Sequence, residues 1–207
     1  METARVFVGC MLDLVTTRRV SDLARALRKR ATDSGWSARW VPPPNLHVTL
    51  KFLGDTDLGL VSPLGATLAE LARRTAPLRL QVSGLDAFPD RDDPRVLFVG
   101  ISSGHDTLSA LAGAVDERLA ELGFPREARA FRGHVTLARV TRAGGPLDAL
   151  CPASSDCGTA TVTELSLFRS DGGRPGAEYQ ALTRHALGVA APEPPGPTPS
   201  IPPPGRP

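Results

Sequence analysis

Lysine, histidine and cysteine are scarce in this chain of 207 residues. The few lysines bear on its charge, and the few cysteines bear on disulfides and metal sites. Lys29 and Lys51 are the only lysines, so arginine supplies nearly all of the positive charge, and the formal net charge is only +2. Such a charge balance does not by itself indicate a nucleic-acid-binding protein. The 3 cysteines are odd in number and form no Cys-x-x-Cys pair, which favours reduced, structural thiols in a cytoplasmic protein.

Long apolar runs are also missing. The apolar run at residues 6–12 ends at Asp13 and is too short to cross a membrane, so we expect no membrane partner. At the other end, residues 190–207 read AAPEPPGPTPSIPPPGRP, with too much proline and too little apolar bulk to form a packed core. The sequence therefore predicts one folded domain over residues 1–189 and a disordered, proline-rich tail over residues 190–207.

What the folded part does contain is a strand–helix–strand pattern that occurs twice. The strands that begin the two copies are expected at residues 5–14 and 95–102, and the helices at 20–31 and 107–122. Each copy then ends in a strand led by histidine. A further helix is expected at 58–74, and further strands at 78–88, 160–170 and 177–187. This interleaving predicts an α+β fold of two similar lobes, built from duplicated units related by a pseudo-two-fold axis.

The final strand of each copy begins with the same tetrapeptide, His-Val-Thr-Leu. Side chains alternate between the faces of a strand, so His47 and Thr49 share one face, as do His134 and Thr136. The alternate positions are expected to face the core: Val48, Leu50 and Phe52 in the first strand, and Val135 and Leu137 in the second. Two such strands would line one groove with two imidazoles and two hydroxyls.

Two imidazoles and two hydroxyls suit the cleavage of a phosphodiester. A neutral imidazole can take a proton from the nucleophile, an imidazolium can protonate the departing oxygen, and threonine hydroxyls can donate to the phosphate. We expect no metal, because no carboxylate or cysteine stands at a spacing that would complete a ligand set with the histidines. The plain alternative is two half-buried strands that look alike, since threonine and valine are common in strands.

The phrases RVFVG, WVPPPNLHVTLKFLG, LDAFP, PRVLFVGI and FRGHVTLARV resemble the two-histidine phosphoesterase superfamily. The branch they resemble is that of the RNA 2′,3′-cyclic phosphodiesterases, also called 2′-5′ RNA ligase-like or LigT-like proteins, over residues 5–187. The resemblance implies two antiparallel sheets around a central groove and no cofactor. It implies hydrolysis of a 2′,3′-cyclic phosphate on an RNA 3′ end to a 2′-phosphate, with reverse 2′-5′ ligation as a further activity. It implies His47 as proton donor, His134 as proton acceptor, and Thr49 and Thr136 as phosphate ligands. The residues alone do not give this assignment, because the pseudo-symmetry also allows the two histidines to exchange roles.

Two positions of the second motif need comment. Relatives usually carry proline just before the second histidine, where this chain has Gly133, and glycine loosens the backbone there. The resemblance also suggests Arg139 as a phosphate ligand. Strict alternation from His134 puts Arg139 on the core face, so the strand must end or bulge before it, or the arginine must reach round the edge.

Further substrate contacts stay open in the sequence. Phe131, Trp40 and Tyr179 are candidates for stacking on a base, and Arg132 for contact with the RNA backbone, with ordinary packing as the alternative for each. Two other functions remain possible on the same residues: a phosphodiesterase for small cyclic nucleotides or 2′-5′-linked oligonucleotides, and a non-catalytic RNA- or nucleotide-binding module. A monomer is expected.

Overall fold

The structure, a computed structural model, describes residues 2–151, 154–171 and 178–188, and the tail expected at 190–207 lies outside them. The strands are β1 Thr3–Met11, β2 Ser37–Trp40, β3 His47–Asp57, β4 Leu78–Phe88, β5 Val96–Ser103, β6 His134–Arg142, β7 Thr159–Val162, β8 Glu164–Asp171 and β9 Glu178–Ala186. The α-helices are α1 Leu14–Asp33, α2 Val61–Arg73 and α3 His105–Ala120. Short 3-10 turns lie at Pro43–Asn45, Leu58–Leu60 and Leu147–Leu150.

The strands form two antiparallel lobes that meet at one point. One lobe has the order β7-β4-β5-β6, with β2 also paired to β6, and the other has the order β3-β1-β8-β9. Between the lobes, β3 and β6 are joined by the single pair Val48–Val135, which makes one curled sheet of the two halves. The expected α+β fold with two antiparallel lobes is confirmed, and the join between the lobes is the detail that the sequence did not indicate.

The repeated unit is also present. β1 pairs with β3 in the first copy and β5 pairs with β6 in the second, with α1 and α3 as the connecting helices. The first copy carries an extra strand, β2, which the sequence analysis missed. Its four residues, Ser-Ala-Arg-Trp, are too few to show alternation clearly, and β2 pairs with β6 of the other lobe, a long-range contact that local pattern does not record.

Some predicted boundaries are wrong for identifiable reasons. The strand predicted at residues 5–14 ends at Met11, and the helix predicted from residue 20 begins at Leu14. The cause is Asp13, whose carboxylate accepts a hydrogen bond of 2.9 Å from the backbone N–H of Thr16 and so caps the helix early. The single strand predicted at 160–170 is two strands in different lobes, β7 beside β4 and β8 beside β1, with Thr163 at the crossing.

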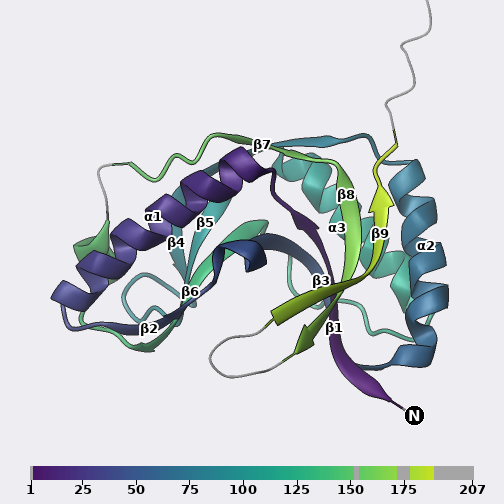
Figure 1. Cartoon of the computed structure of the whole chain (residues 1–207), viewed down its shortest axis with the longest axis horizontal. Helices are drawn as coiled ribbons and strands as arrows, with labels where there is room; N and C mark the ends of the chain where they lie inside the picture. Colours follow the sequence, from purple (N-terminus) through teal and green to yellow (C-terminus); the bar gives the residue numbers. More distant parts are fainter. Residues whose placement is uncertain (1, 152–153, 172–177, 189–207) are drawn as a thin grey trace, which may run out of the picture.

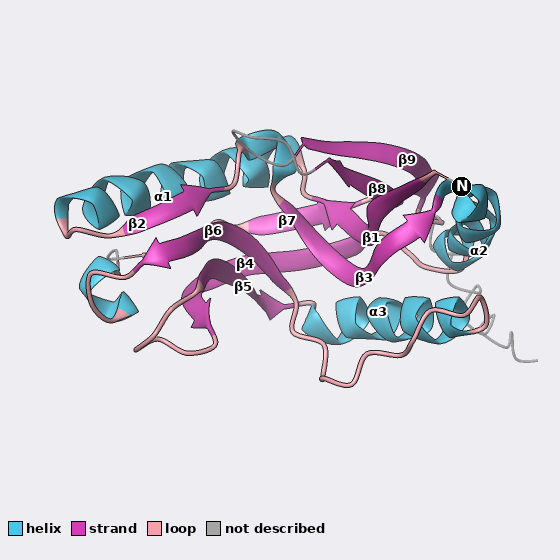
Figure 2. Ribbon diagram, turned by 90° about the horizontal axis from the view of Figure 1, so that it is seen from below, coloured by secondary structure: helices cyan, strands magenta, loops and turns pink. Residues whose placement is uncertain are grey.

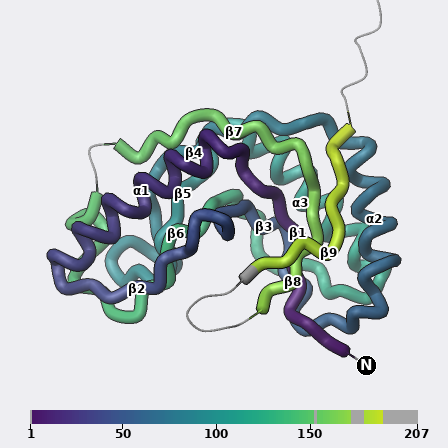
Figure 3. Tube along the Cα trace, viewed as in Figure 1, coloured from purple at the N-terminus to yellow at the C-terminus, as the bar shows by residue number. Residues whose placement is uncertain are grey.

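The helices pack on the strands from several sides. α1 packs against β2, β6 and β7 in one lobe, and α2 packs against β8 and β9 in the other (Figure 1). α3 contacts β3 as well as β4 and β5, so it ties the two lobes together, and Figure 2 shows the strands lying between α1 and α3. The trace in Figure 3 shows β1 running beside the late strand β8, with which it pairs.

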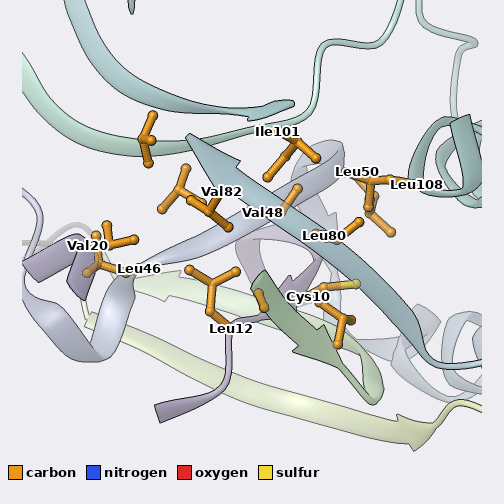
Figure 4. Close-up of a cluster of buried hydrophobic side chains, with 14 of the residues drawn as sticks. Cys10, Leu12, Val20, Leu46, Val48, Leu50, Leu80, Val82, Ile101 and Leu108 are labelled. Atoms are coloured by element: carbon orange, nitrogen blue, oxygen red, sulfur yellow. The ribbon is translucent and has the colours of Figure 1, made fainter. Parts of the chain in front are cut away.

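A single buried cluster extends through both lobes. Cys10 and Val48 from one lobe pack with Leu80 from the other and Leu108 from α3, as Figure 4 shows. Such continuous apolar burial is the main stabilising contribution to a fold of this size. The two lobes therefore share one core and are expected to unfold together.

Each histidine-led strand contains a β-bulge at the same place. In β3, Val8 pairs with Lys51 and Gly9 pairs with Thr49, so Leu50 has no partner of its own on β1. In β6, Leu97 pairs with Ala138 and Phe98 pairs with Thr136, so Leu137 is skipped in the same way. In both strands the two bulge residues are buried side by side.

The bulges reverse the alternation beyond them. The prediction that Phe52 faces the core with Val48 and Leu50 is therefore wrong: Phe52 is 63% exposed. A strictly alternating strand would have buried it, whereas the extra residue of the bulge returns it to the face that carries His47 and Thr49. Arg139, the equivalent position of β6, is likewise exposed.

Candidate active site

The pair Val48–Val135 brings the four motif side chains together. Because the two strands are antiparallel, the residues flanking this pair place His47 opposite Thr136, and Thr49 opposite His134, on the face away from the buried valines. The histidines are then diagonal neighbours, and diagonal neighbours in such a pair lie about 7–8 Å apart. The charge of His134 also acts on His47, lowering the pKa of that imidazole. Both His-x-Thr motifs thus converge on one patch of the groove.

Each imidazole is held by a backbone carbonyl two residues before it. Nδ1 of His47 donates to the carbonyl oxygen of Asn45 at 2.7 Å, and Nδ1 of His134 donates to that of Arg132, also at 2.7 Å. A carbonyl can only accept, so Nδ1 carries the proton and Nε2 of each ring is the atom left for chemistry. Nε2 of His47 lies 2.9 Å from Oγ1 of Thr49. None of the described residues makes a hydrogen bond to Nε2 of His134.

Aromatic rings pack against both imidazoles. The ring centroid of His47 lies 4.8 Å from that of Phe7 and 5.1 Å from that of Tyr179. The ring of His134 lies 5.0 Å from both Phe88 and Phe98. These contacts fix the orientation of the imidazoles and remove water from their faces.

The same burial changes how the two histidines titrate. Burial lowers the pKa of His47 below its ordinary value, the hydrogen bond to Asn45 opposes this, and the charge of His134 lowers it further. Burial also lowers the pKa of His134, where the hydrogen bond to Arg132 opposes the shift and the charges of Arg132 and Arg139 add to it. Both rings therefore favour the neutral form more than a histidine in water does.

Arg139 lies on the groove side of β6, which answers the question that its spacing raised. Its guanidinium is near enough to lower the pKa of His134 and to oppose the rise that burial gives the pKa of Tyr179. Arg39 of β2 is directly opposite Arg139 in the ladder and shares its face. One side of the groove thus carries the guanidinium of Arg139 near His134, with Arg39 on the neighbouring strand.

The other predicted contact residues have different environments. Tyr179 stands edge-on to His47, as described above, and Phe131 lines a hollow beside His134. Trp40 pairs with the fully buried Ala138, so it lies on the core side and not in the groove. Arg132 donates to Asp86 at 2.5 Å, and its guanidinium carbon lies 4.9 Å from the ring centroid of Phe98.

Gly133 is tightly enclosed, contrary to the looseness that its lack of a side chain suggested. A Cβ at this position would lie 2.7 Å from Cδ2 of Leu108 and 3.4 Å from Cγ1 of Ile101. Leu108 is completely buried and cannot move aside without disturbing the core. The glycine therefore lets the chain pass close to α3 just before His134, and packing holds the backbone there.

A hollow of about 490 Å³ opens beside His134. It is lined by Thr49 and Phe52 from β3, by α3, by residues 127 and 129–132 of the segment before β6, and by His134 at the start of β6. Its volume lies in the range of about 300–1,000 Å³ that is usual for ligand sites. Among the described residues there is no cluster of three or more histidine, cysteine or carboxylate side chains placed to hold a metal ion. No described helix is long and apolar enough to span a membrane.

Comparison with known proteins identifies the family to which this duplicated fold belongs. The family model for LigT like Phosphoesterase matches residues 14–98 and, separately, residues 99–179. The chain belongs to this family. As a family member it is a phosphoesterase, and each matched segment contains one His-Val-Thr-Leu strand, in agreement with the duplication seen in the sheet.

Several curated relatives carry the same name. A protein of Aquifex aeolicus named RNA 2′,3′-cyclic phosphodiesterase is 34% identical over 141 residues, which is 68% of this chain and 72% of that one. A protein of Aeropyrum pernix with the same name is 33% identical over 168 residues, 79% of this chain and 93% of that one. The likeness thus extends over most of both proteins.

Solved structures agree in fold. The crystal structure of TT0787 of Thermus thermophilus superposes with a TM-score of 0.74 at 27% identity, covering 90% of this chain and all 100% of that one. The structure of Escherichia coli LigT complexed with 3′-AMP gives a TM-score of 0.67 at 24% identity, covering 90% of this chain and 99% of that one. At that identity the second likeness supports the fold alone.

Some residues that pack on the histidines were not predicted from the sequence, above all Phe7 and Phe98. A signal for them was available. The strands RVFVG and RVLFVG occupy the same place in the two repeats, and the phenylalanine two residues before the glycine is common to both. Reading the repeat as two copies of one site would have paired each of these rings with a histidine.

Proposed function

We propose that this phosphoesterase hydrolyses the 2′,3′-cyclic phosphate at an RNA 3′ end to a 2′-phosphate by metal-independent acid–base catalysis. The observation that carries the proposal is that the two His-x-Thr motifs meet on one face of the sheet, with each imidazole held through Nδ1 so that Nε2 is left for chemistry. The curated relatives named RNA 2′,3′-cyclic phosphodiesterase support the choice of substrate. Together these features favour RNA or nucleotide ends over unrelated phosphodiesters.

The reaction needs one proton removed from the attacking water and one proton delivered to the departing oxygen. Nε2 of neutral His134 takes a proton from water as the water oxygen forms a bond to phosphorus. Nε2–H of protonated His47 gives a proton to the 3′-oxygen as the bond from phosphorus to that oxygen breaks. Thr49, Thr136 and Arg139 donate to the non-bridging oxygens, where charge grows in the transition state. The two histidines finish with their protonation states exchanged and are reset by solvent.

The assignment of acid and base follows the family resemblance, which gives His134 as proton acceptor and His47 as proton donor. Burial lowers the pKa of both histidines; the charges of Arg132 and Arg139 lower that of His134 further, and the charge of His134 lowers that of His47 further. His47 has Phe7 and Tyr179 against it and lies within hydrogen-bond distance of Thr49, a partner compatible with either protonation state.

The pH dependence should be bell-shaped with an acidic maximum. The working state holds one proton on the pair, and its population peaks between the two macroscopic pKa values. Because burial lowers the pKa of both histidines, we expect kcat/KM to be greatest below about pH 6.5, the pKa of histidine in water. A bound phosphate anion favours the protonated rings, so the kcat profile should lie at higher pH than the kcat/KM profile. Initial rates over pH 4.5–9 at about ten substrate concentrations test this, and a kcat/KM maximum above neutrality would contradict it.

The threonine hydroxyls should matter less than the imidazoles. Thr136→Val keeps the shape of the side chain and removes one hydrogen bond to a charged phosphate, which is worth about 1.5–3 kcal/mol. We expect kcat to fall about 10- to 100-fold, and the same for Thr49→Val. Thr136→Ser retains the hydroxyl and should stay within a few-fold of the parent protein. Equal turnover by the valine and serine variants would exclude a phosphate contact at this position.

The direct test is an RNA oligonucleotide that ends in a 2′,3′-cyclic phosphate, incubated with the protein in the presence of chelator. The product isomer decides which bond was broken, because cleavage at the 3′-oxygen leaves a 2′-phosphate. Nucleoside 2′,3′-cyclic phosphates and 2′-5′-linked oligonucleotides serve as parallel substrates. Turnover of these alone would assign the chain to small nucleotides, and binding without any turnover would make it a binding module.

A further inference from the structure

Arg132 contacts both of the supports that hold the imidazole of His134. Its backbone carbonyl oxygen accepts Nδ1–H of that ring at 2.7 Å. Its guanidinium carbon lies 5.2 Å from the ring centroid of Phe88 and 4.9 Å from that of Phe98. The centroid of each phenyl ring in turn lies 5.0 Å from that of the imidazole. Because a guanidinium is attracted to an aromatic face, the position of this one residue bears on how His134 is oriented.

The carboxylate of Asp86 determines where that guanidinium lies. Asp86 is directly opposite Phe98 in the ladder between β4 and β5, and Phe98 is directly opposite Thr136 of β6. The three residues therefore form a row across the groove face of the sheet. Oδ2 of Asp86 accepts a hydrogen bond of 2.5 Å from Nη2 of Arg132. The ion pair thus crosses over β5 and connects β4 to the segment just before β6.

Asp86 is itself held from two other sides. Its Oδ1 accepts from the backbone N–H of Ala87 at 2.9 Å and from Nη1 of Arg91 at 3.2 Å. Burial alone would raise the pKa of Asp86, but the hydrogen bonds from Ala87, Arg132 and Arg91 outweigh it and lower that pKa below its ordinary value. The carboxylate is therefore charged at neutral pH and fixed in position, with its side chain only 29% exposed.

The two motif histidines differ in how much they depend on such support. Nδ1 of His47 donates to the carbonyl oxygen of Asn45, and Nε2 of the same ring has Thr49 as a second partner. Within the described part of the chain, His134 has only the carbonyl of Arg132 as a hydrogen-bond partner. The orientation of His134 therefore rests on the Nδ1 contact and on the rings packed against it.

We propose that Asp86 and Arg132 are positioning residues for His134: their ion pair fixes the guanidinium on the two phenyl rings and so keeps the carbonyl of residue 132 directed at Nδ1. Neither side chain has to touch the substrate. The arrangement leaves Nε2 of neutral His134 without a proton, as the proton acceptor of the proposed function requires. The inference rests on that function only for its effect on turnover, since the tautomer of the ring is measurable without substrate.

The kinetic test uses adenosine 2′,3′-cyclic phosphate. Asp86→Ala and Arg132→Met should each lower kcat about 10- to 100-fold with KM nearly unchanged, because a small misplacement of a catalytic group slows the chemical step. The double variant should be no slower than the slower single variant, since both changes break the same contact. Asp93→Ala is the matched control: it breaks another ion pair, to Arg95 at 2.9 Å with both side chains exposed, and should leave kcat unchanged.

Nitrogen-15 NMR of the imidazoles at about pH 8, where histidine is mostly neutral, reads the position of the proton directly. His134 of the parent protein should carry its proton on Nδ1, and both single variants should show a larger fraction with the proton on Nε2. Arg132→Met should also raise the pKa of His134, because the charge of Arg132 adds to burial in lowering it. In this variant Asp86 keeps its bonds from Ala87 and Arg91, so it serves as the test if Asp86→Ala does not fold.

The outcomes separate this inference from the proposed function. If no cyclic phosphate is turned over but the variants change the tautomer of His134, the function fails and the positioning role stands. If the parent turns over normally and the variants keep its kcat and tautomer, or if the two single losses multiply in the double variant, the positioning role is wrong and the function stands. A rise in KM for an RNA oligonucleotide alone in Arg132→Met, with kcat unchanged, would assign the guanidinium to the RNA backbone and overturn the proposal.

Discussion

His47→Ala and His134→Ala should each lose about 10²–10⁴-fold in kcat for a cyclic-phosphate RNA while KM changes little. The loss is in kcat because each ring acts on a proton that moves only in the transition state. Neither substitution should unfold the chain, since both side chains are only partly buried and face the groove. Single-turnover rates measured beside a binding titration separate the two effects.

His185→Ala is the matched control. This histidine also lies within hydrogen-bond distance of a threonine hydroxyl, 3.0 Å from Oγ1 of Thr183, but it is near Arg73 of α2 and outside the imidazole pair. Its removal should leave turnover unchanged. The parent protein should keep full activity in EDTA, because the proposed mechanism uses no metal. Loss of activity on chelation, or near-normal turnover by either groove variant, would reject the acid–base pair.

Asp116→Asn should destabilise the fold by about 3 kcal/mol, because it leaves the ammonium of Lys51 buried without a counter-charge. Lys51 follows Leu50 in the β3 bulge, its side chain is 1% exposed, and it pairs with Asp116 of α3 and donates to the carbonyl oxygen of Pro125 at 2.7 Å. The ion pair holds α3 and the segment after it against β3. These three elements line the hollow. Thermal and urea unfolding measure the loss, expected as a fall in Tm of about 6–12 °C for a chain of this size.

The only other lysine provides the control. Lys29 pairs with Asp33 at 2.9 Å on the surface of α1, with side chains 81% and 61% exposed, and Lys29→Met should change stability by less than about 0.5 kcal/mol. The double variant Lys51→Met with Asp116→Asn removes both charges and should be less destabilised than the sum of its single changes. Additive losses would mean that the two side chains act independently and that the buried pair is not what holds α3.

The sequence alone is sufficient to detect the repeated strand–helix–strand unit, because its pattern lies within short, continuous segments of the chain. The placement of His47 with Thr49, and of His134 with Thr136, on one face of their own strands needs only the two-residue period of a strand, whereas their meeting on one surface depends on the pair Val48–Val135. β4 was predicted with its observed bounds for the same reason, as apolar residues alternate over 78–82 and again over 85–87, on either side of a break at Ser83 and Gly84.

The parts that sequence reasoning missed are set by contacts between distant segments. A bulge depends on how one strand fits its neighbour, so the reversal of Phe52 could not be read from β3 alone, and the position of Arg139 stayed ambiguous until the pairing of β6 with β5 was known. β2 forms as a strand because it pairs with β6. Lys51 is buried because Asp116 of α3 lies beside it as a counter-charge. Each of these is a property of two elements together.

The single pair Val48–Val135 has a consequence for how the two halves of the chain can change over time. Around that pair the molecule has the symmetry of a homodimer with its active site on the dyad, yet both halves belong to one polypeptide. In a true homodimer every substitution would appear twice, so acid and base would have identical surroundings and a substrate could bind equally well in either direction. Fusion removes that constraint: one half can keep a phenyl ring at the position where the other has a guanidinium, and one imidazole can acquire two neighbouring arginines without the other doing so. Polarity across a symmetric pair of histidines is thus available only to a chain that carries both copies.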